Sequence, residues 1–160
     1  MATRKVIIDC DPGQDDAVAL FLAMASPGEL DILGVTTVAG NVPLALTQRN
    51  ARMMCDIAGR RDMRVFAGCE RPLRRPPITA EYIHGATGID GVDVFEPDTP
   101  LQEEHAVDFI VETLRNEVSV TLIPTGPMTN FAAAIEREPS ILDSVEQIVS
   151  MGGAMREGGN

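Results

Sequence analysis

The sequence predicts an α/β fold with an open, mostly parallel, Rossmann-like sheet and helices on both faces. Short apolar runs rich in β-branched residues recur along the chain, and such runs are typical of buried strands. Stretches with apolar residues at helical spacing lie between these runs. Strands that alternate with helices indicate a parallel sheet whose crossover connections are right-handed.

The first two strands and the helix between them have clear signals. Residues 5–8 form a short apolar run, and the stretch after them carries an apolar stripe made of Ala17, Leu20, Phe21 and Met24. This stripe follows the i, i+3, i+4, i+7 spacing of a helix with one buried face. The longer apolar run 32–38 predicts a mostly buried parallel strand.

Later elements repeat the alternation. We expect a helix over 43–58, because Pro43 suits a helix start and Gly59 a helix end. A short strand over 64–67 then stops at Gly68. After a long irregular stretch, the remaining elements are a helix around 107–114, a strand over 119–123, a helix over 128–137 and a last strand over 145–151.

Residues 69–100 break the periodic pattern and form a candidate lid. This stretch contains five of the eleven prolines and a histidine, His84, followed by several glycines. A loop of this length in a compact domain is usually functional or disordered, and such loops often close over active sites. An ordinary surface excursion with a solvated histidine is the alternative, and the sequence leaves both open.

Length and charge limit the classes of function. With 160 residues, the chain is one domain or part of a larger one, so we treat 1–160 as one unit. A net charge of −11 argues against nucleic acid or an anionic membrane as a partner. The three cysteines have no metal-type spacing, and we see neither a signal-peptide core nor a transmembrane run. We expect buried thiols and a cytoplasmic protein.

Four aspartates, Asp9, Asp11, Asp15 and Asp16, surround the junction between the first strand and the first helix. Carboxylates this close repel one another unless some are protonated or a cation lies among them. Hard oxygen ligands favour Ca²⁺ or Mg²⁺ over a soft metal. The alternative is helix capping by Asp15 and Asp16, but capping does not explain Asp9 and Asp11 on the strand.

Other polar or pocket-type residues follow the carboxyl ends of the predicted strands. Asn41 follows the second strand, Thr125 follows the strand over 119–123, and Met151 ends the last strand. Each alone is more typical of a turn or of the core. In a parallel sheet, however, these ends lie along one edge, so the side chains can converge on a ligand-binding crevice.

The sequence resembles the calcium-dependent nucleoside hydrolases, the inosine–uridine-preferring N-ribohydrolases. The matching segments are DCDPGQDDAVAL, VTTVAGN, AGCERPL, YIHGATG, LIPTGPMTN and VSMGGAMREGGN. The first segment is highly specific to that family, and the others follow in the family's order and spacing. The match covers essentially all 160 residues but only about the N-terminal half of a family chain, so the sheet is expected to be incomplete.

The resemblance implies a Ca²⁺ cofactor and a catalytic base. Asp11 and Asp16 would coordinate Ca²⁺ through their carboxylates, and Thr125 through its main-chain carbonyl. Asp11 would also be the general base for a Ca²⁺-bound water. Asp9 would support the Ca²⁺ ligands without binding the ion itself. Three protein ligands are too few for the six to eight that Ca²⁺ usually takes.

The resemblance also implies a ribonucleoside substrate. Asp15 and Asn41 would bind the ribose hydroxyls, Met151 would line the sugar pocket, and Asn160 would reach the 5′ end of the ribose. The reaction would hydrolyse the N-glycosidic bond to free base and ribose. The family's habit implies a homo-oligomer, a dimer or a tetramer. The residues present do not define which base is preferred.

Two other functions remain open from the sequence. Because the second half of a family chain is absent from this sequence, it could be a non-catalytic, truncated fragment that binds Ca²⁺ or ribose. A Mg²⁺ phosphatase of the haloacid-dehalogenase type also has Asp-x-Asp after its first strand. In such a phosphatase, however, Gly-Thr usually follows the motif, whereas Pro12-Gly13 follows Asp11 here, and the pair Asp15 and Asp16 would have no role.

Overall fold

The computed structural model describes residues 3–153 and 155–156. In this part of the chain, six parallel strands form one sheet in the order β4-β3-β2-β1-β5-β6. The strands are β1 (Arg4–Cys10), β2 (Leu30–Thr37), β3 (Val65–Ala67), β4 (Leu101–Gln102), β5 (Val120–Pro124) and β6 (Val145–Ile148). The predicted open parallel sheet is confirmed.

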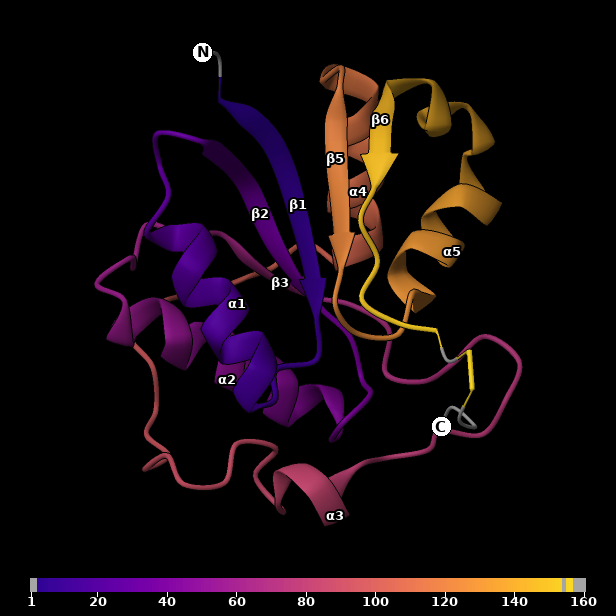
Figure 1. Cartoon of the computed structure of the whole chain (residues 1–160). Coiled ribbons are helices and arrows are strands. Elements are labelled where there is room, and N and C mark those ends of the chain that lie inside the picture. Colours follow the sequence, from indigo (N-terminus) through magenta and orange to yellow (C-terminus); the bar gives the residue numbers. More distant parts are fainter. Residues whose placement is uncertain (1–2, 154, 157–160) are drawn as a thin grey trace.

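Helices cover both faces of the sheet (Figure 1). They are α1 (Gln14–Met24), α2 (Leu44–Ile57), α3 (Glu81–His84), α4 (Ala106–Asn116), α5 (Thr129–Arg137) and the 3₁₀ helix η1 (Pro139–Ser144). Helices α1 and α2 pack on the face that carries Val6 and Ile8. Helices α4 and α5, with η1, pack on the other face, where Ile7 of β1 points. This alternation of side chains along β1 is what a strand buried on both faces requires.

The strand order places a topological switch point next to β1. Strand β1 pairs with β2 on one side and with β5 on the other. The chain builds the sheet outward through β2, β3 and β4, and then returns to begin the opposite direction with β5. In open α/β sheets, ligands bind at the carboxyl ends of the strands at such a point.

The structure corrects several predicted boundaries. The irregular stretch after β3 contains a short helix, α3, and ends at strand β4, so order resumes before residue 105. The last strand ends at Ile148 and not at residue 151, and η1 precedes it. All three cysteines are free thiols, but Cys69 is only partly buried, whereas Cys10 and Cys55 are buried as expected.

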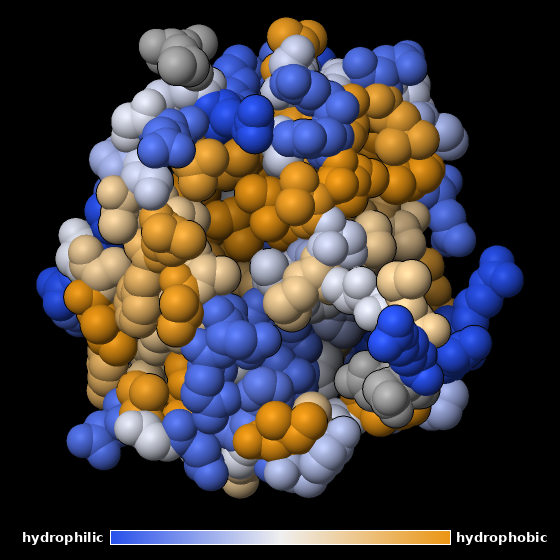
Figure 2. Space-filling view, in the orientation of Figure 1, coloured by the Kyte–Doolittle hydropathy of each residue, from blue (hydrophilic) through white to orange (hydrophobic). Residues whose placement is uncertain are grey.

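One side of the molecule is unusually apolar. The outer side of α1 exposes Val18 and Leu22 by 65% and 69%, and Ile148 and Val149 at the end of β6 are also exposed. Figure 2 shows hydrophobic surface running over α1 and the β5–β6 end of the sheet. A helix that is apolar on every side is typical of a buried position. Contiguous patches of this kind are typical of contact surfaces.

No helix in the described residues is both long enough and apolar enough to cross a bilayer. The longest of them, α2, has 14 residues, whereas a membrane-spanning helix needs about 20.

Two leucines on α1 test which side of the helix is in the core. Leu20 is 1% exposed and packs on β1 and β2, whereas Leu22 is 69% exposed. We expect Leu20→Ala to lower the free energy of unfolding of this chain by about 2–5 kcal/mol, because it leaves a cavity. Leu22→Ala should change it by less than about 0.5 kcal/mol. Urea denaturation of the two variants measures the difference, and equal losses would contradict the packing described here.

Candidate active site

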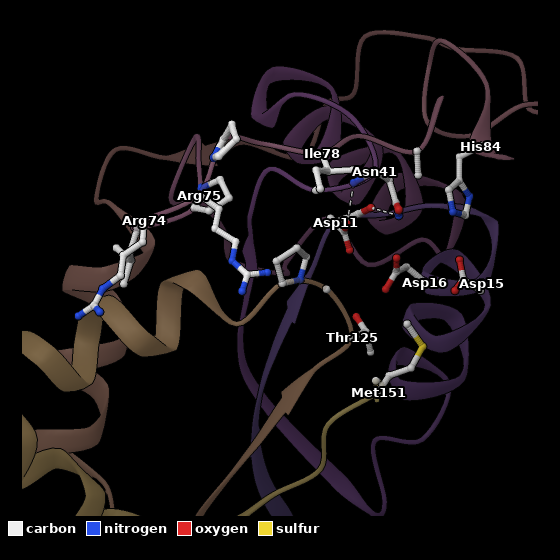
Figure 3. A pocket seen from close by; sticks show the side chains of 18 residues that line it. Asp11, Asp15, Asp16, Asn41, Arg74, Arg75, Ile78, His84, Thr125 and Met151 are labelled. Carbon is white, nitrogen blue, oxygen red and sulfur yellow. Dashed lines mark hydrogen bonds between the residues drawn. The ribbon is translucent and has the colours of Figure 1, made fainter. Parts of the chain in front are cut away.

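A pocket of about 630 Å³ lies at the carboxyl ends of β1, β2, β5 and β6. Figure 3 shows its lining side chains. The structure brings together at this pocket six of the residues predicted from the sequence: Asp11, Asp15, Asp16, Asn41, Thr125 and Met151. The seventh, Asn160, lies outside the described residues. The pocket is at the switch point, as the fold predicts.

Asp11 is held rigidly at the end of β1. It is 5% exposed, and its Oδ2 accepts a hydrogen bond of 2.7 Å from the main-chain N–H of Asn41. The Asn41 side chain donates to the main-chain oxygen of Asp11 at 2.9 Å. A Cβ atom on Gly40 or on Gly126 would overlap the Asp11 carboxylate. Glycine at both positions therefore lets the loops after β2 and β5 close in on this group.

Asp16 faces Asp11 across the pocket floor. Asp15 and Asp16 lie in the first turn of α1, as predicted, and the Oδ2 of Asp16 accepts the Gly13 N–H at 3.2 Å. The Oδ1 of Asp16 is buried and has no hydrogen-bond partner among the described residues. Figure 3 shows the carboxylates of Asp11 and Asp16 pointing toward one another above Thr125, with Asp15 at the side. Capping thus uses only one oxygen of Asp16.

Asp9 lies behind the pocket, on the face of the sheet that α5 covers. It is fully buried, and its Oδ1 accepts hydrogen bonds from Thr36 Oγ1 at 2.6 Å and from Asn130 Nδ2 at 2.7 Å. Its Oδ2 is buried without a partner among the described residues. The main-chain oxygen of Asp9 accepts the Thr125 N–H at 2.8 Å. Asp9 therefore joins β1 to both neighbouring strands and to α5.

Sequence reasoning missed Asn130. This fully buried side chain on α5 donates to Asp9 and to the Thr37 main-chain oxygen at 3.0 Å, and it accepts the Cys69 N–H at 2.8 Å. Its only sequence signal is a polar residue in an otherwise apolar part of a short helix. It fixes the ends of β1, β2 and β3 relative to one another.

Burial raises the pKa of the carboxyl groups at this site. It raises the pKa of Asp9 and of Asp11 from 3.8 to about 7, and the nearby charge of Asp16 adds to the effect in both. Burial also raises the pKa of Asp16. These groups are therefore costly to ionise unless a cation is close to them. Neither Asp9, Asp11 nor Asp16 takes part in an ion pair within the described residues.

The donors fit part of a Ca²⁺ site. The described residues contain no group of three or more His, Cys, Asp or Glu side chains that could hold a metal ion. The predicted set is different, because it combines two carboxylates with a main-chain carbonyl. Hard oxygen donors and the unpartnered Oδ1 of Asp16 suit Ca²⁺, but this set is smaller than the six to eight ligands that the ion usually takes.

The irregular segment after β3 forms one wall of the pocket. Arg74 and Arg75, which the sequence analysis did not select, line it together with His84 of α3. The Ala80 N–H donates to the main-chain oxygen of Asn41 at 2.8 Å and so anchors the segment beside the site. The segment is placed where a lid would lie, and its movement stays a prediction.

Comparison with known proteins gives the family. The sequence model of the inosine-uridine preferring nucleoside hydrolases matches residues 6–160. The chain belongs to this family. Among curated relatives, the inosine-uridine preferring nucleoside hydrolase of Crithidia fasciculata is 44% identical over 158 residues, which cover 97% of this chain and 50% of that protein. An uncharacterized protein of Schizosaccharomyces pombe is 52% identical over 158 residues, which cover 98% of this chain and 51% of that protein.

Solved structures of nucleoside hydrolases share the fold. A plant nucleoside hydrolase, PpNRh1, superposes with a TM-score of 0.91 at 37% identity, covering 99% of this chain and 51% of that one. A purine-preferring ribonucleoside hydrolase from Gardnerella vaginalis gives a TM-score of 0.88 at 35% identity, covering 94% and 49%. This nucleoside hydrolase chain thus spans about half the length of the relatives it matches.

The raised pKa values predict how stability depends on pH. Asp9 and Asp11 have a folded pKa of about 7 against an ordinary value of 3.8, so the folded state binds their protons more tightly than the unfolded state does. The contribution of these two groups to the free energy of unfolding should be largest below about pH 4 and should be lost as the pH rises through about 7. Urea denaturation in buffer with a chelator measures this dependence, and Asp11→Asn should flatten it. A pH dependence that Asp11→Asn leaves unchanged would contradict the prediction.

The close approach of Gly126 to Asp11 is testable with a matched glycine. A Cβ at Gly126 would overlap Asp11 Oδ1, whereas a Cβ at Gly28 would meet nothing within 4 Å. We expect Gly126→Ala to lower the free energy of unfolding by about 1–3 kcal/mol through overpacking. Gly28→Ala should leave it within about 0.5 kcal/mol. Thermal or urea unfolding of both variants decides, and an equal effect would show that Asp11 is not confined from this side.

Proposed function

We propose that this chain supplies the sugar-facing part of the active site of an enzyme that hydrolyses the N-glycosidic bond of ribonucleosides to free base and ribose. The observation that supports the proposal most directly is the facing pair Asp11 and Asp16, buried at the switch point of a nucleoside hydrolase fold. The family match favours this activity over the phosphatase alternative.

Asp11 is suited to act as the general base. Without a cation, burial raises its pKa to about 7, and a bound cation would lower that value, so Asp11 would be deprotonated and able to accept a proton at neutral pH. The hydrogen bond from the Asn41 N–H holds Oδ2 in place, so Oδ1 is the oxygen left to accept a proton. In the proposed step, water oxygen bonds to C1′ of the sugar and the water proton passes to Asp11. The C1′–N bond breaks, and its electron pair leaves with the nucleobase.

The anionic pocket also suits the sugar. Cleavage of a glycosidic bond passes through an oxocarbenium-like state, which nearby carboxylates stabilise electrostatically. We propose that Asp15 and Asn41 bind ribose hydroxyls and that Met151, which is 53% exposed, contacts the apolar side of the sugar. Asn160 keeps its predicted role at the 5′ end as a proposal, because it lies outside the described residues.

Ca²⁺ is the proposed cofactor, held by Asp11, Asp16 and the carbonyl of Thr125. When bound, a divalent ion lowers the pKa of a water ligand and orients a sugar diol. The buried carboxylates are the chain's own contribution: their raised pKa values fall when a cation replaces the missing solvation. The remaining ligands would come from water or from residues beyond this chain.

A non-catalytic fragment that binds Ca²⁺ or ribose is the second candidate. The observation that favours it is that the chain spans about half of its relatives. Binding of Ca²⁺ measured by calorimetry, without formation of ribose under any condition, is the result that this alternative predicts.

The activity test uses release of free ribose from inosine and uridine. The 160-residue chain is assayed with Ca²⁺ and with EDTA, alone and co-expressed with the C-terminal half of the Crithidia fasciculata nucleoside hydrolase. We expect ribose release that needs Ca²⁺ and that falls by about 10²- to 10⁴-fold in Asp11→Asn, the range for losing a general base.

The matched control is Asp31→Asn, an exposed aspartate at the opposite end of β2 that should leave the rate unchanged. Absence of ribose in both the single and the co-expressed form would refute the hydrolase proposal. An equal loss in Asp11→Asn and Asp31→Asn would refute the role of Asp11.

A further inference from the structure

We propose that Gln14 is a positioning residue that fixes His84 in its Nδ1–H tautomer, so that the ring presents an unprotonated Nε2 at the pocket. The proposal deepens the proposed function by assigning a hydrogen-bond acceptor to the site. Its central claim, the tautomer, is independent of metal and substrate.

A chain of hydrogen bonds determines the orientation of the Gln14 amide. Gln14 Nε2 donates to the main-chain oxygen of Asp90 at 3.1 Å, and Gln14 Oε1 lies 2.7 Å from His84 Nδ1. A carbonyl oxygen can only accept a hydrogen bond, so the amide nitrogen must point toward Asp90. The flipped amide would place two oxygens against each other, which would repel. Gln14 Oε1 is therefore the group that faces the imidazole.

The amide orientation in turn determines the state of the His84 ring. An amide oxygen has no proton to give, so the hydrogen bond requires a proton on Nδ1 of His84. In the neutral ring, the other nitrogen, Nε2, then carries a lone pair and accepts hydrogen bonds. The described residues offer Nε2 no hydrogen-bond partner, and His84 lines the pocket. Figure 3 shows the ring beside Asp15 and Asp16.

The surrounding backbone holds the ring in this place. A Cβ at Gly13 would lie 2.5 Å from His84 Nδ1, so the absence of a side chain there lets the ring lie against the turn before α1. The Asp90 N–H donates to the His84 main-chain oxygen at 2.9 Å. Gly85 adopts a φ of +79° between them, and a Cβ there would overlap the Asp90 carboxylate. Gln14 thus ties a closed loop, 84–90, to the first turn of α1.

The arrangement separates two roles on the first turn of α1. Asp15 and Asp16 face the pocket, whereas Gln14 is absent from its lining and acts only through His84. An acceptor at Nε2 suits a hydroxyl or water donor, and ribose hydroxyls are such donors. A pocket wall that already contains three carboxylates gains from this a neutral acceptor that adds no negative charge.

The test is long-range ¹H–¹⁵N NMR of the two histidine rings at about pH 8, where a free imidazole is neutral. Protonated and unprotonated ring nitrogens differ strongly in ¹⁵N shift. The chain has only two histidines, and the second is an internal reference: His105 Nδ1 accepts the Val107 N–H at 3.2 Å, so its proton must be on Nε2. We expect His84 and His105 to show opposite patterns.

Two variants separate positioning from mere packing. Gln14→Leu removes the acceptor, so the His84 pattern should change to the Nε2–H form that free histidine favours. Gln14→Glu keeps an acceptor oxygen near Nδ1 and should retain a proton there. The His105 signals should stay unchanged in both variants and so report an intact fold.

Two outcomes would overturn the proposal. One is Nε2–H at His84 in the unaltered chain, and the other is a His84 pattern that Gln14→Leu does not change. Failure of ribose release with the predicted tautomer present would count against the hydrolase proposal and not against the role of Gln14.

Discussion

The burial of three carboxylates around the end of β1 is the constraint on which the site depends. Asp9, Asp11 and Asp16 are each at most 5% exposed, and removing an ionised carboxylate from water costs several kcal/mol unless something compensates. Main-chain N–H groups of Asn41 and Gly13 compensate in part, as do the side chains of Thr36 and Asn130. The part of the desolvation cost that these hydrogen bonds do not offset raises the pKa of the carboxyl groups. A site of this kind favours a cation, because a nearby positive charge stabilises the ionised carboxylates.

The strand order is what makes this arrangement possible. Loops after β2 and β5 approach Asp11 from both sides because β2 and β5 are the two neighbours of β1 in the sheet. Gly40 and Gly126 stand at the points of closest approach, and any side chain there would displace the carboxylate. The aspartate motif therefore needs its two distant glycines, and a chain carrying only the motif would lack the geometry.

The sequence allowed much of this to be predicted, because period-2 and period-3.6 patterns determine which way side chains point. The sheet, its two helical layers and the meeting of Asp11, Asn41, Thr125 and Met151 at one edge all follow from that logic. The contacts across long sequence separations did not follow. Asn130 bonds to Asp9 from 121 positions away, and its polarity within a short helix does not identify that distant partner.

The errors in secondary structure have a related physical cause. Strand β4 has two residues and pairs only with β3, so its existence depends on a neighbour and not on its own composition.

His84 was selected from the sequence as part of a lid, but its partner Gln14 lies 70 positions earlier. Short motifs describe a strand or a turn well, whereas hydrogen bonds between loops depend on the finished fold.

The apolar outer side of α1 bears on how the site is completed. On α4, the comparable outward positions are charged, with Glu112 and Arg115 exposed, whereas α1 exposes Val18 and Leu22. The same helix begins at the pocket with Asp15, and β6 leads to the pocket through Met151. A polypeptide that covered α1 and the end of β6 would therefore pass the pocket between these two residues.

About half the length of the relatives lies outside the region that this chain matches, and the proposed Ca²⁺ site takes three donors from this chain, fewer than the six to eight that the ion usually has. A single polypeptide segment that lay over α1 and the end of β6 would both cover the apolar surface and supply further ligands. It would remove Val18 and Leu22 from water and would bring additional donors to the open side of the carboxylate pair.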